Sequence, residues 1–287
     1  MGAGEAVRRR AEPAVGPVPY LYWAGPDPQA PAAVLLHGLT SSSVTWLDLG
    51  AHLSDRFHVY APDQRGHGLG PRPAEPEYPI TRFADDLLEF LSVLGLRRPL
   101  LVGHSWGGGA ALIAAAALSR DPAAEAPSAL ILEDPVHAIG TSRQRAIAAR
   151  MLTLQGFDTE ALSAELLRGE PTMTQDQLAE RVAQLRSTSA ELLEQIGADE
   201  TEHSLLPHFS ELACPVLLVL ADTSLSQVFD DDTLAEAQPL LPAGSYATRL
   251  AQAPHTIHRS GPERFAREID AFLSLAPSSP AKSVPET

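Results

Sequence analysis

A serine stands at the tip of a predicted strand–turn–helix, in the sequence GHSWG at residues 103–107. An apolar run leads up to it and a small-residue helix pattern follows. The glycines two positions on either side of Ser105 remove side chains that would collide in so tight a turn, which leaves the hydroxyl exposed above a sheet. The motif therefore predicts covalent catalysis at Ser105. A serine hydroxyl acts as a nucleophile only when a base is in contact with it, so a base must lie nearby. The alternative is a serine that only caps the following helix.

The sequence lacks the patterns of other catalytic chemistries. No two histidines have the H-x-x-x-H spacing of a zinc site on a helix. The glycine-containing loop at 65–70 does not match a phosphate-binding motif. The acidic triplet Asp230, Asp231 and Asp232 indicates a solvated loop or a helix N-terminus. We therefore predict no cofactor and no metal, and a small molecule as the substrate.

The elements that must position Ser105 alternate between short apolar runs and helical patterns. Strands are expected at 20–23, 33–37, 57–61, 99–102, 129–132, 215–220 and 246–250, and helices at 46–53, 81–94, 107–118 and after 261. This alternation predicts an α/β fold with a mostly parallel central sheet flanked by helices. Sites in such sheets lie at the carboxyl ends of the strands.

Residues 137–206 interrupt the alternation, because only helical spacing occurs there. Capping boxes are predicted at Thr141, Thr174 and Thr188. We interpret 137–206 as an inserted all-helical cap, or lid, on a core formed by 1–136 and 207–276. The Pro- and Ser-rich stretch 277–287 is expected to be a disordered tail.

These motifs, in this order, resemble the α/β-hydrolase family over roughly residues 18–275. The resemblance rests on His37-Gly38, on the loop at 63–68, on the GHSWG motif, on an acid after a late strand, and on a histidine before Pro-Glu-x-Phe at 262–265. It implies the α/β-hydrolase fold and a serine hydrolase with a catalytic triad in the chain order Ser, Asp, His.

By this resemblance, His255 is the general base, since it lies in the loop after the last strand. His258 is the rival, and otherwise a solvent-facing residue beside Arg259. The family usually carries glycine before its histidine, whereas Pro254 stands there in this chain. Proline restricts the backbone, so the loop is expected to follow a different path.

The resemblance also implies that Asp222, after the apolar run 216–221, is the carboxylate that orients His255. Some family members use an acid one strand earlier, so Asp134 and Glu133 are the alternatives. Asp134 could instead be a turn residue before Pro135.

The resemblance also implies an oxyanion hole formed by the backbone N–H groups of Leu39 and Trp106, with Thr40 as the alternative to Leu39. By the same resemblance, other polar residues near these motifs are expected to organise loops rather than to catalyse: His37, His104, Arg65 and His67.

Composition limits the partners. The chain has 287 residues, 44% of them hydrophobic, which supports one large core with an insertion. Its net charge of −15 disfavours nucleic acid and anionic membranes. The single cysteine, Cys214, is expected to be a buried structural thiol. The N-terminus does not resemble a secretory signal and the apolar run 110–118 is too short to span a bilayer, so we expect a cytoplasmic protein, either monomer or homodimer.

The predicted reaction is hydrolysis of a small, largely apolar carboxylic ester or lactone through an acyl-enzyme. The cap is rich in Leu, Ala, Ile and Met, including Met151, Leu154 and Met173, and an adaptable apolar lid suits a hydrophobic acyl or ring group. Alternatives on the same triad are amide or C–C bond cleavage and perhydrolysis. A hydrolase-fold sensor with little turnover and a structural scaffold are the non-enzymatic alternatives.

Overall fold

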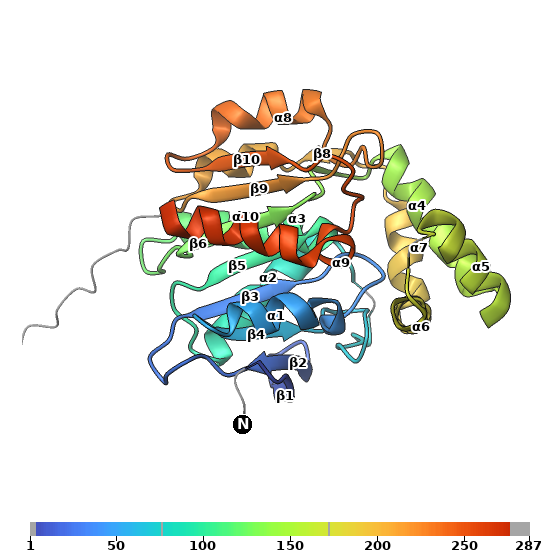
Figure 1. The fold of residues 1–287 in the computed structure, drawn as a ribbon, viewed down its shortest axis with the longest axis horizontal. Coiled ribbons are helices and arrows are strands. Elements are labelled where there is room, and N and C mark those ends of the chain that lie inside the picture. Colours follow the sequence, from blue (N-terminus) through green and yellow to red (C-terminus); the bar gives the residue numbers. More distant parts are fainter. Residues whose placement is uncertain (1–3, 76, 172, 276–287) are drawn as a thin grey trace, which may run out of the picture.

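The computed structural model describes residues 4–75, 77–171 and 173–275. The predicted tail at 277–287 lies outside them. Within the described residues, eight strands form a central sheet in the order β1-β2-β4-β3-β5-β6-β9-β10 (Figure 1). Their bounds are Val7–Ala11 (β1), Val18–Trp23 (β2), Ala32–Leu36 (β3), His58–Pro62 (β4), Leu100–His104 (β5), Ala129–Glu133 (β6), Val216–Leu220 (β9) and Tyr246–Arg249 (β10). The pairs β1–β2 and β2–β4 are antiparallel and the other neighbours are parallel, which confirms the predicted fold class.

Helices cover both faces of this sheet. One face packs against α2 (Ile80–Val93) and α3 (Ser105–Arg120), and the other against α1 (Leu47–Leu53) and α10 (Pro262–Leu275). Alternate strand residues enter the two cores, as Val34 and Leu35 of β3 show. The smaller helices are η1 (Ser43–Trp46), η2 (Leu206–Glu211), α8 (Asp231–Ala237), η3 (Gln238–Leu240) and α9 (Ile257–Ser260). Strand β1 was not predicted, because its sequence carries three exposed arginines and little apolar signal.

Within the described residues, four α-helices lie between β6 and β9 and extend to one side of the sheet, on the right in Figure 1. They are α4 (Ser142–Gln155), α5 (Thr159–Gly169), α6 (Gln175–Arg186) and α7 (Ala190–Ala198), and we call α4–α7 the cap. A short antiparallel pair, β7 (Ala138–Ile139) and β8 (His203–Ser204), joins the start and end of this segment.

Two of the three predicted capping boxes form. Thr141 and Thr174 each accept from the backbone N–H three residues later. The third prediction is wrong by one residue, because Ser189 caps α7. The Thr188 hydroxyl instead donates to the Gln184 carbonyl at 2.9 Å.

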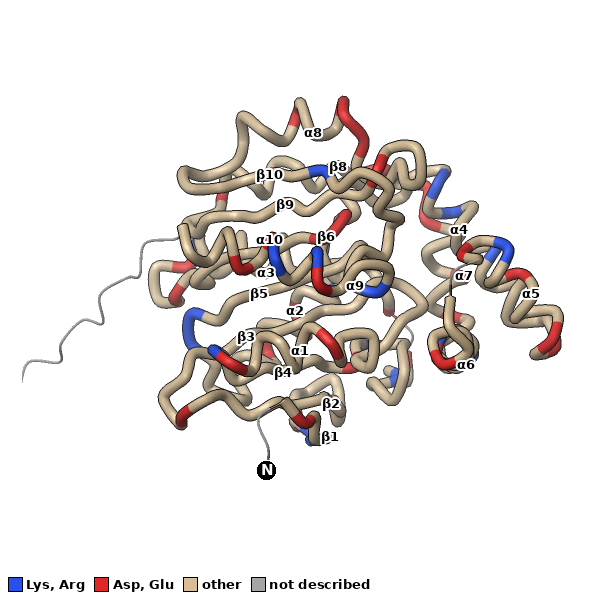
Figure 2. Tube along the Cα trace, viewed as in Figure 1, with Lys and Arg blue, Asp and Glu red and all other residues tan. Residues whose placement is uncertain are grey.

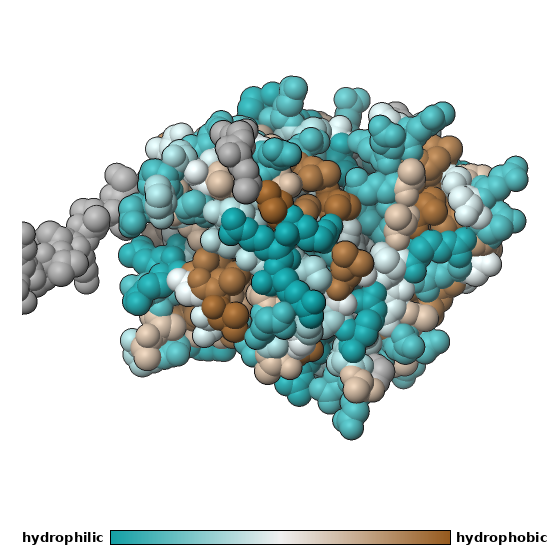
Figure 3. Space-filling view, turned by 90° about the horizontal axis from the view of Figure 1, so that it is seen from below, coloured by the Kyte–Doolittle hydropathy of each residue, from teal (hydrophilic) through white to brown (hydrophobic). Residues whose placement is uncertain are grey.

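The acidic residues of the sequence are spread over the fold. Asp and Glu occur along the trace, on the helices of the core and on the cap (Figure 2). On the face seen in Figure 3, apolar residues form separate patches among hydrophilic ones. Within the described ranges, no helix combines the length and the apolar character needed to cross a bilayer. Cys214 is buried, and burial raises the pKa of its thiol to about 12, as a structural cysteine requires.

Candidate active site

Ser105 occupies the sharp turn between β5 and α3. Its backbone has φ +50°, a left-handed conformation that a non-glycine residue adopts at a cost. A Cβ at Gly103 would lie 2.7 Å from the Gly107 carbonyl oxygen, and a Cβ at Gly107 would lie 2.3 Å from the His37 carbonyl oxygen. The two glycines therefore allow the turn and its packing against β3, which is the steric role that the motif predicts.

A chain of hydrogen bonds connects Ser105 to a histidine and a carboxylate. The Ser105 Oγ lies 2.9 Å from Nε2 of His255, and Nδ1 of His255 lies 2.6 Å from Oδ2 of Asp134. The Asp134 side chain is buried, whereas that of His255 is 32% exposed. Asp134 also accepts from the Ser226 hydroxyl at 2.7 Å and from the Ala221 N–H at 3.3 Å. These donors fix the carboxylate so that it orients the imidazole towards the serine.

The prediction that Asp222 orients His255 is corrected by this geometry. The Asp222 carboxylate accepts hydrogen bonds from the Gln252 N–H and from the N–H and hydroxyl of Ser224, and these bonds lower its pKa to about 2. The Asp222 carboxylate is thus held by backbone N–H groups of its own loop and of the loop after β10, whereas Asp134 follows β6, the strand next to the serine strand β5. The alternative acid of the sequence analysis, Asp134, is therefore the one placed against His255.

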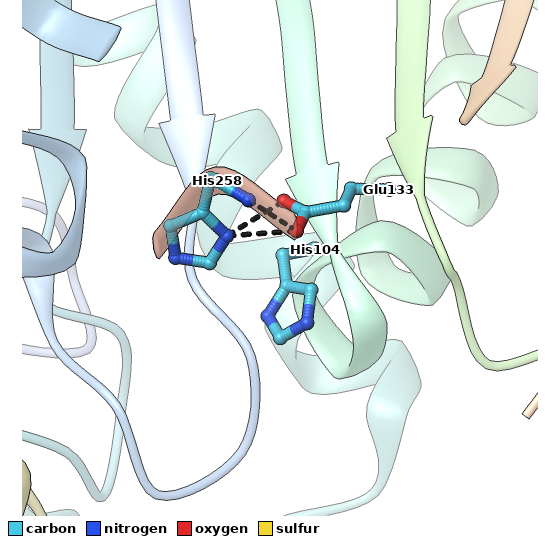
Figure 4. Close-up of side chains that lie close together, drawn as sticks. All are labelled: His104, Glu133 and His258. Carbon is cyan, nitrogen blue, oxygen red and sulfur yellow. Dashed lines mark hydrogen bonds and ion pairs between the residues drawn. The ribbon is translucent and has the colours of Figure 1, made fainter. Parts of the chain in front are cut away.

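His258 forms a second acid–histidine pair rather than contacting Ser105. Its Nδ1 lies 2.7 Å from Oε2 of Glu133 and its Nε2 lies 2.6 Å from the Thr45 hydroxyl. The side chain is 2% exposed, so the expectation of a solvent-facing residue is wrong. Figure 4 shows the ring directed at the Glu133 carboxylate, with His104 beside them.

His104 and Glu133 end neighbouring strands and are register partners. His104 Nε2 donates to the His255 carbonyl at 3.0 Å. Burial lowers the pKa values of His104 and His258 well below the usual value, and burial raises the pKa of Glu133. In this cluster both the carboxyl and the imidazoles are thus biased towards their uncharged forms.

This cluster is also where the described residues bring potential metal ligands together. Ligand atoms of His104, Glu133 and His258 lie within 4.8 Å of one another. A metal ion would have to replace the hydrogen bond between His258 and Glu133, which already pairs a donor with an acceptor. The acidic triplet is accounted for differently, since the Asp230 carboxylate caps α8 by accepting from the Thr233 N–H.

The predicted oxyanion donors lie beside the serine. Leu39 and Trp106 both border the pocket onto which Ser105 opens. Trp106 is in the first turn of α3, where backbone N–H groups have no acceptor within the helix. Thr40 has φ +56°, and the cap residue Arg181 donates to its carbonyl oxygen and, at 2.9 Å, to its hydroxyl. A cap helix therefore holds the loop that presents Leu39.

The remaining polar residues predicted to organise loops do so. His37 Nε2 accepts from the Gln64 N–H at 3.1 Å, and His67 Nδ1 donates to the Arg65 carbonyl at 2.9 Å. Arg65 also binds both carboxylate oxygens of Asp86, at 2.5 and 2.6 Å.

A pocket of about 360 Å³ lies between the core and the cap and contains Ser105 and His255. Its apolar lining includes Val136, Ala138, Ile147, Met151, Ile196 and Val228. Leu154, another apolar residue of the predicted lid, packs inside the cap against Leu162 and Leu185. The polar lining includes Arg143, Arg181 and Arg259, which sequence reasoning missed. The one local signal was the position of Arg259, four residues after His255.

Comparison with known proteins identifies the family of this fold. A model of the alpha/beta hydrolase family matches residues 33–268. The chain belongs to the α/β-hydrolase family. Membership supports hydrolase activity without fixing the bond that is cleaved. Over 82 residues, the chain is 43% identical to an uncharacterized protein of Mycobacterium tuberculosis, a match that spans 29% of this chain and about a quarter (24%) of that relative.

Two further proteins match this chain over most of its length. It is 28% identical over 253 residues to a 2-(acetamidomethylene)succinate hydrolase of Mesorhizobium japonicum, covering 85% of this chain and 88% of that protein. The crystal structure of an E-2-(acetamidomethylene)succinate hydrolase superposes with a TM-score of 0.77 at 25% identity, covering 94% of this chain and 100% of that one.

Proposed function

We propose that this α/β-hydrolase is a serine hydrolase that forms an acyl-enzyme on Ser105. The observation that carries the proposal is the chain of two hydrogen bonds, of 2.9 and 2.6 Å, from Ser105 through His255 to Asp134. His255 Nε2 takes the serine proton as Oγ attacks a carbonyl carbon, and Asp134 holds the ring and stabilises the imidazolium that forms.

The negative charge of the tetrahedral intermediate is assigned to the backbone N–H groups of Leu39 and Trp106. As the intermediate collapses, His255 returns the proton to the leaving alcohol or amine, which departs and leaves an ester on Ser105. Water then attacks that ester and gives its proton to His255. The acid is released and the serine hydroxyl is restored. Fixed donors at the oxyanion contribute about 3–4 kcal/mol each to such reactions.

The substrate that we propose is a small ester or lactone. The pocket holds about 360 Å³ and has apolar walls on the cap side, which fits a compact acyl group. Amide cleavage is the second candidate, because the full-length relative with 28% identity is named for hydrolysis of 2-(acetamidomethylene)succinate. Both reactions use the same three residues and differ in the leaving group that His255 must protonate.

The test uses a fluorophosphonate probe and a panel of 4-nitrophenyl esters, lactones and anilides of varied acyl length. The wild-type protein should become labelled on Ser105 and should turn over at least one substrate many times. Ser105→Ala should abolish labelling and lower turnover by about 10⁵-fold or more, with unchanged circular dichroism. Labelling with only one or two turnovers on every substrate would instead favour a sensor. Absence of labelling would favour a scaffold.

A further inference from the structure

Three arginines from different elements border the pocket that contains Ser105. Arg143 comes from α4, Arg181 from α6 and Arg259 from α9. The chain has 36 acidic and 21 basic residues, so positive charge is scarce, yet three of its cations border this pocket. Among the described residues, none of the three has a carboxylate oxygen within the 4.0 Å of an ion pair, whereas Arg65 and Arg249 do have such partners.

The hydrogen bonds of Arg181 and Arg143 go to neutral groups. Arg181 binds Thr40 and, at 3.4 Å, the Gln184 side chain, and Arg143 binds the Gln227 side chain at 2.9 Å. The Nε of Arg259 is buried and has no hydrogen-bond partner within the described residues. A buried guanidinium N–H without an acceptor is costly, so its presence at the pocket that contains Ser105 needs a reason.

The charges around the pair Arg181 and Arg259 do not supply that reason. Burial and the neighbouring Arg259 charge lower the pKa of Arg181 to about 9, so the two cations destabilise each other. Glu170 and Glu180 oppose this effect. Burial raises the pKa of Glu180 and the Arg259 charge lowers it, but the Glu180 carboxylate accepts from Gln184 at 2.7 Å and, among the described residues, forms no ion pair with either arginine.

The acidic residue that borders the pocket directly, Asp230, is also committed elsewhere. Its carboxylate accepts from both the N–H and the hydroxyl of Thr233 at the start of α8. An additional anion placed between the cap and α9 would therefore relieve the repulsion between the two arginines and satisfy the free Nε of Arg259.

We propose that the pocket binds substrates that carry a carboxylate in addition to the scissile carbonyl, with Arg259 and Arg181 as its binding residues and Arg143 at the exposed edge. The apolar walls would hold the hydrocarbon between the two carbonyl groups. A planar guanidinium binds a carboxylate through two N–H groups and so fixes the position of the substrate relative to Ser105. This inference rests on the proposed function, whose acyl group it specifies.

The first test compares two esters that differ only in a terminal charge, mono-4-nitrophenyl glutarate and 4-nitrophenyl pentanoate, after subtraction of spontaneous hydrolysis. The wild-type protein should show a kcat/KM at least tenfold higher for the glutarate ester. Arg259→Gln should reduce this ratio tenfold or more, mainly through KM. Arg150→Gln, an equal change of charge at an exposed position of α4, is the matched control and should leave the ratio unchanged.

The second test measures binding without turnover. Isothermal titration calorimetry at low ionic strength should detect binding of glutarate to Ser105→Ala. The affinity of Ser105→Ala/Arg259→Gln for glutarate should be at least tenfold lower. Glutarate binding without hydrolysis of any substrate would overturn the proposed function and keep the carboxylate subsite. Hydrolysis of the pentanoate ester with a charge ratio near one and no glutarate binding would overturn the subsite alone.

Discussion

Two acid–histidine pairs lie next to each other in this protein and have different surroundings. Asp134 and His255 border the pocket, where the histidine side chain is 32% exposed. Glu133 and His258 lie behind them with side chains that are 0% and 2% exposed. The two acids are consecutive in the chain but point in different directions. Glu133 ends β6 and follows the alternation of that strand towards the face covered by α1 and α10, whereas Asp134 has φ +38° and turns towards Ser226.

In each pair the acid binds Nδ1 of the histidine, and the partner of the other ring nitrogen, Nε2, distinguishes the candidate base from the structural residue. Nε2 of His255 faces Ser105, but Nε2 of His258 is occupied by the Thr45 hydroxyl. The buried pair still serves the exposed one. Glu133 accepts from the His258 N–H at 2.9 Å, which anchors the chain three residues after His255. We therefore expect the exposed pair to govern activity and the buried pair to govern stability.

The largest expected effect is that of Asp134→Asn on turnover. The amide keeps the size of the side chain but cannot stabilise the His255 imidazolium, and such a change in a serine–histidine–aspartate triad lowers kcat by about 10⁴-fold. The matched control is Asp222→Asn, which should change kcat less than threefold. Steady-state kinetics with a 4-nitrophenyl ester measure both. A loss in Asp222→Asn that equals the loss in Asp134→Asn would contradict the placement of the acid.

The same two aspartates show what the sequence could and could not predict. Alternating apolar runs predicted the sheet and its flanking helices, and the glycine spacing predicted the turn at Ser105. Both Asp134 and Asp222 follow buried strands, so local pattern does not separate them. Their tertiary contacts separate them: the Asp222 carboxylate accepts from the Ser224 and Gln252 N–H groups, whereas Asp134 lies 2.6 Å from the His255 ring, a contact between residues 121 positions apart. Arg181 escaped prediction for a related reason, because its contact with Thr40 joins residues 141 positions apart.

The next effect concerns the buried pair. Glu133→Ala removes the acceptor of two N–H groups of His258, and each buried donor left without a partner lowers the free energy of unfolding by about 1–3 kcal/mol. Glu263→Ala, in an exposed 3.9 Å ion pair on α10, is the control and should leave stability nearly unchanged. Urea denaturation followed by fluorescence measures both. An unchanged stability in Glu133→Ala would show that the buried pair does not support the fold.

A smaller effect is expected on the other side of His258. Thr45→Val keeps the shape of the side chain but leaves Nε2 of the buried ring without its donor, at a cost of about 1–3 kcal/mol in the free energy of unfolding. Thr153→Val, at an exposed threonine of α4 whose hydroxyl donates to the Ala149 carbonyl, is the matched control. If the two variants lost equal stability by urea denaturation, the hydrogen bond between Thr45 and His258 would be unimportant.

The smallest effect is a difference in how stability depends on pH. Because burial holds the pKa of His258 well below 6.5, the unfolded chain takes up a proton at this ring as pH falls below 6.5 and the folded protein does not. Stability is therefore lost on acidification. The raised pKa of Glu133 has the opposite effect on stability. Above about pH 4.5 the folded state retains a proton that the unfolded chain has released, so this contribution to stability falls as pH rises.

His258→Gln removes one of these contributions. Between pH 5.5 and 6.5 the free energy of unfolding should depend on pH less steeply than in the wild type, by about 1 kcal/mol per pH unit. Urea titrations at several pH values measure the two slopes, with His203→Gln, at an exposed histidine of β8, as the control. Equal slopes in His258→Gln and wild type would mean that His258 is already a cationic imidazolium in the folded protein over this pH range. The buried pair would then be an ion pair, and the contrast between the two pairs would lie in exposure alone.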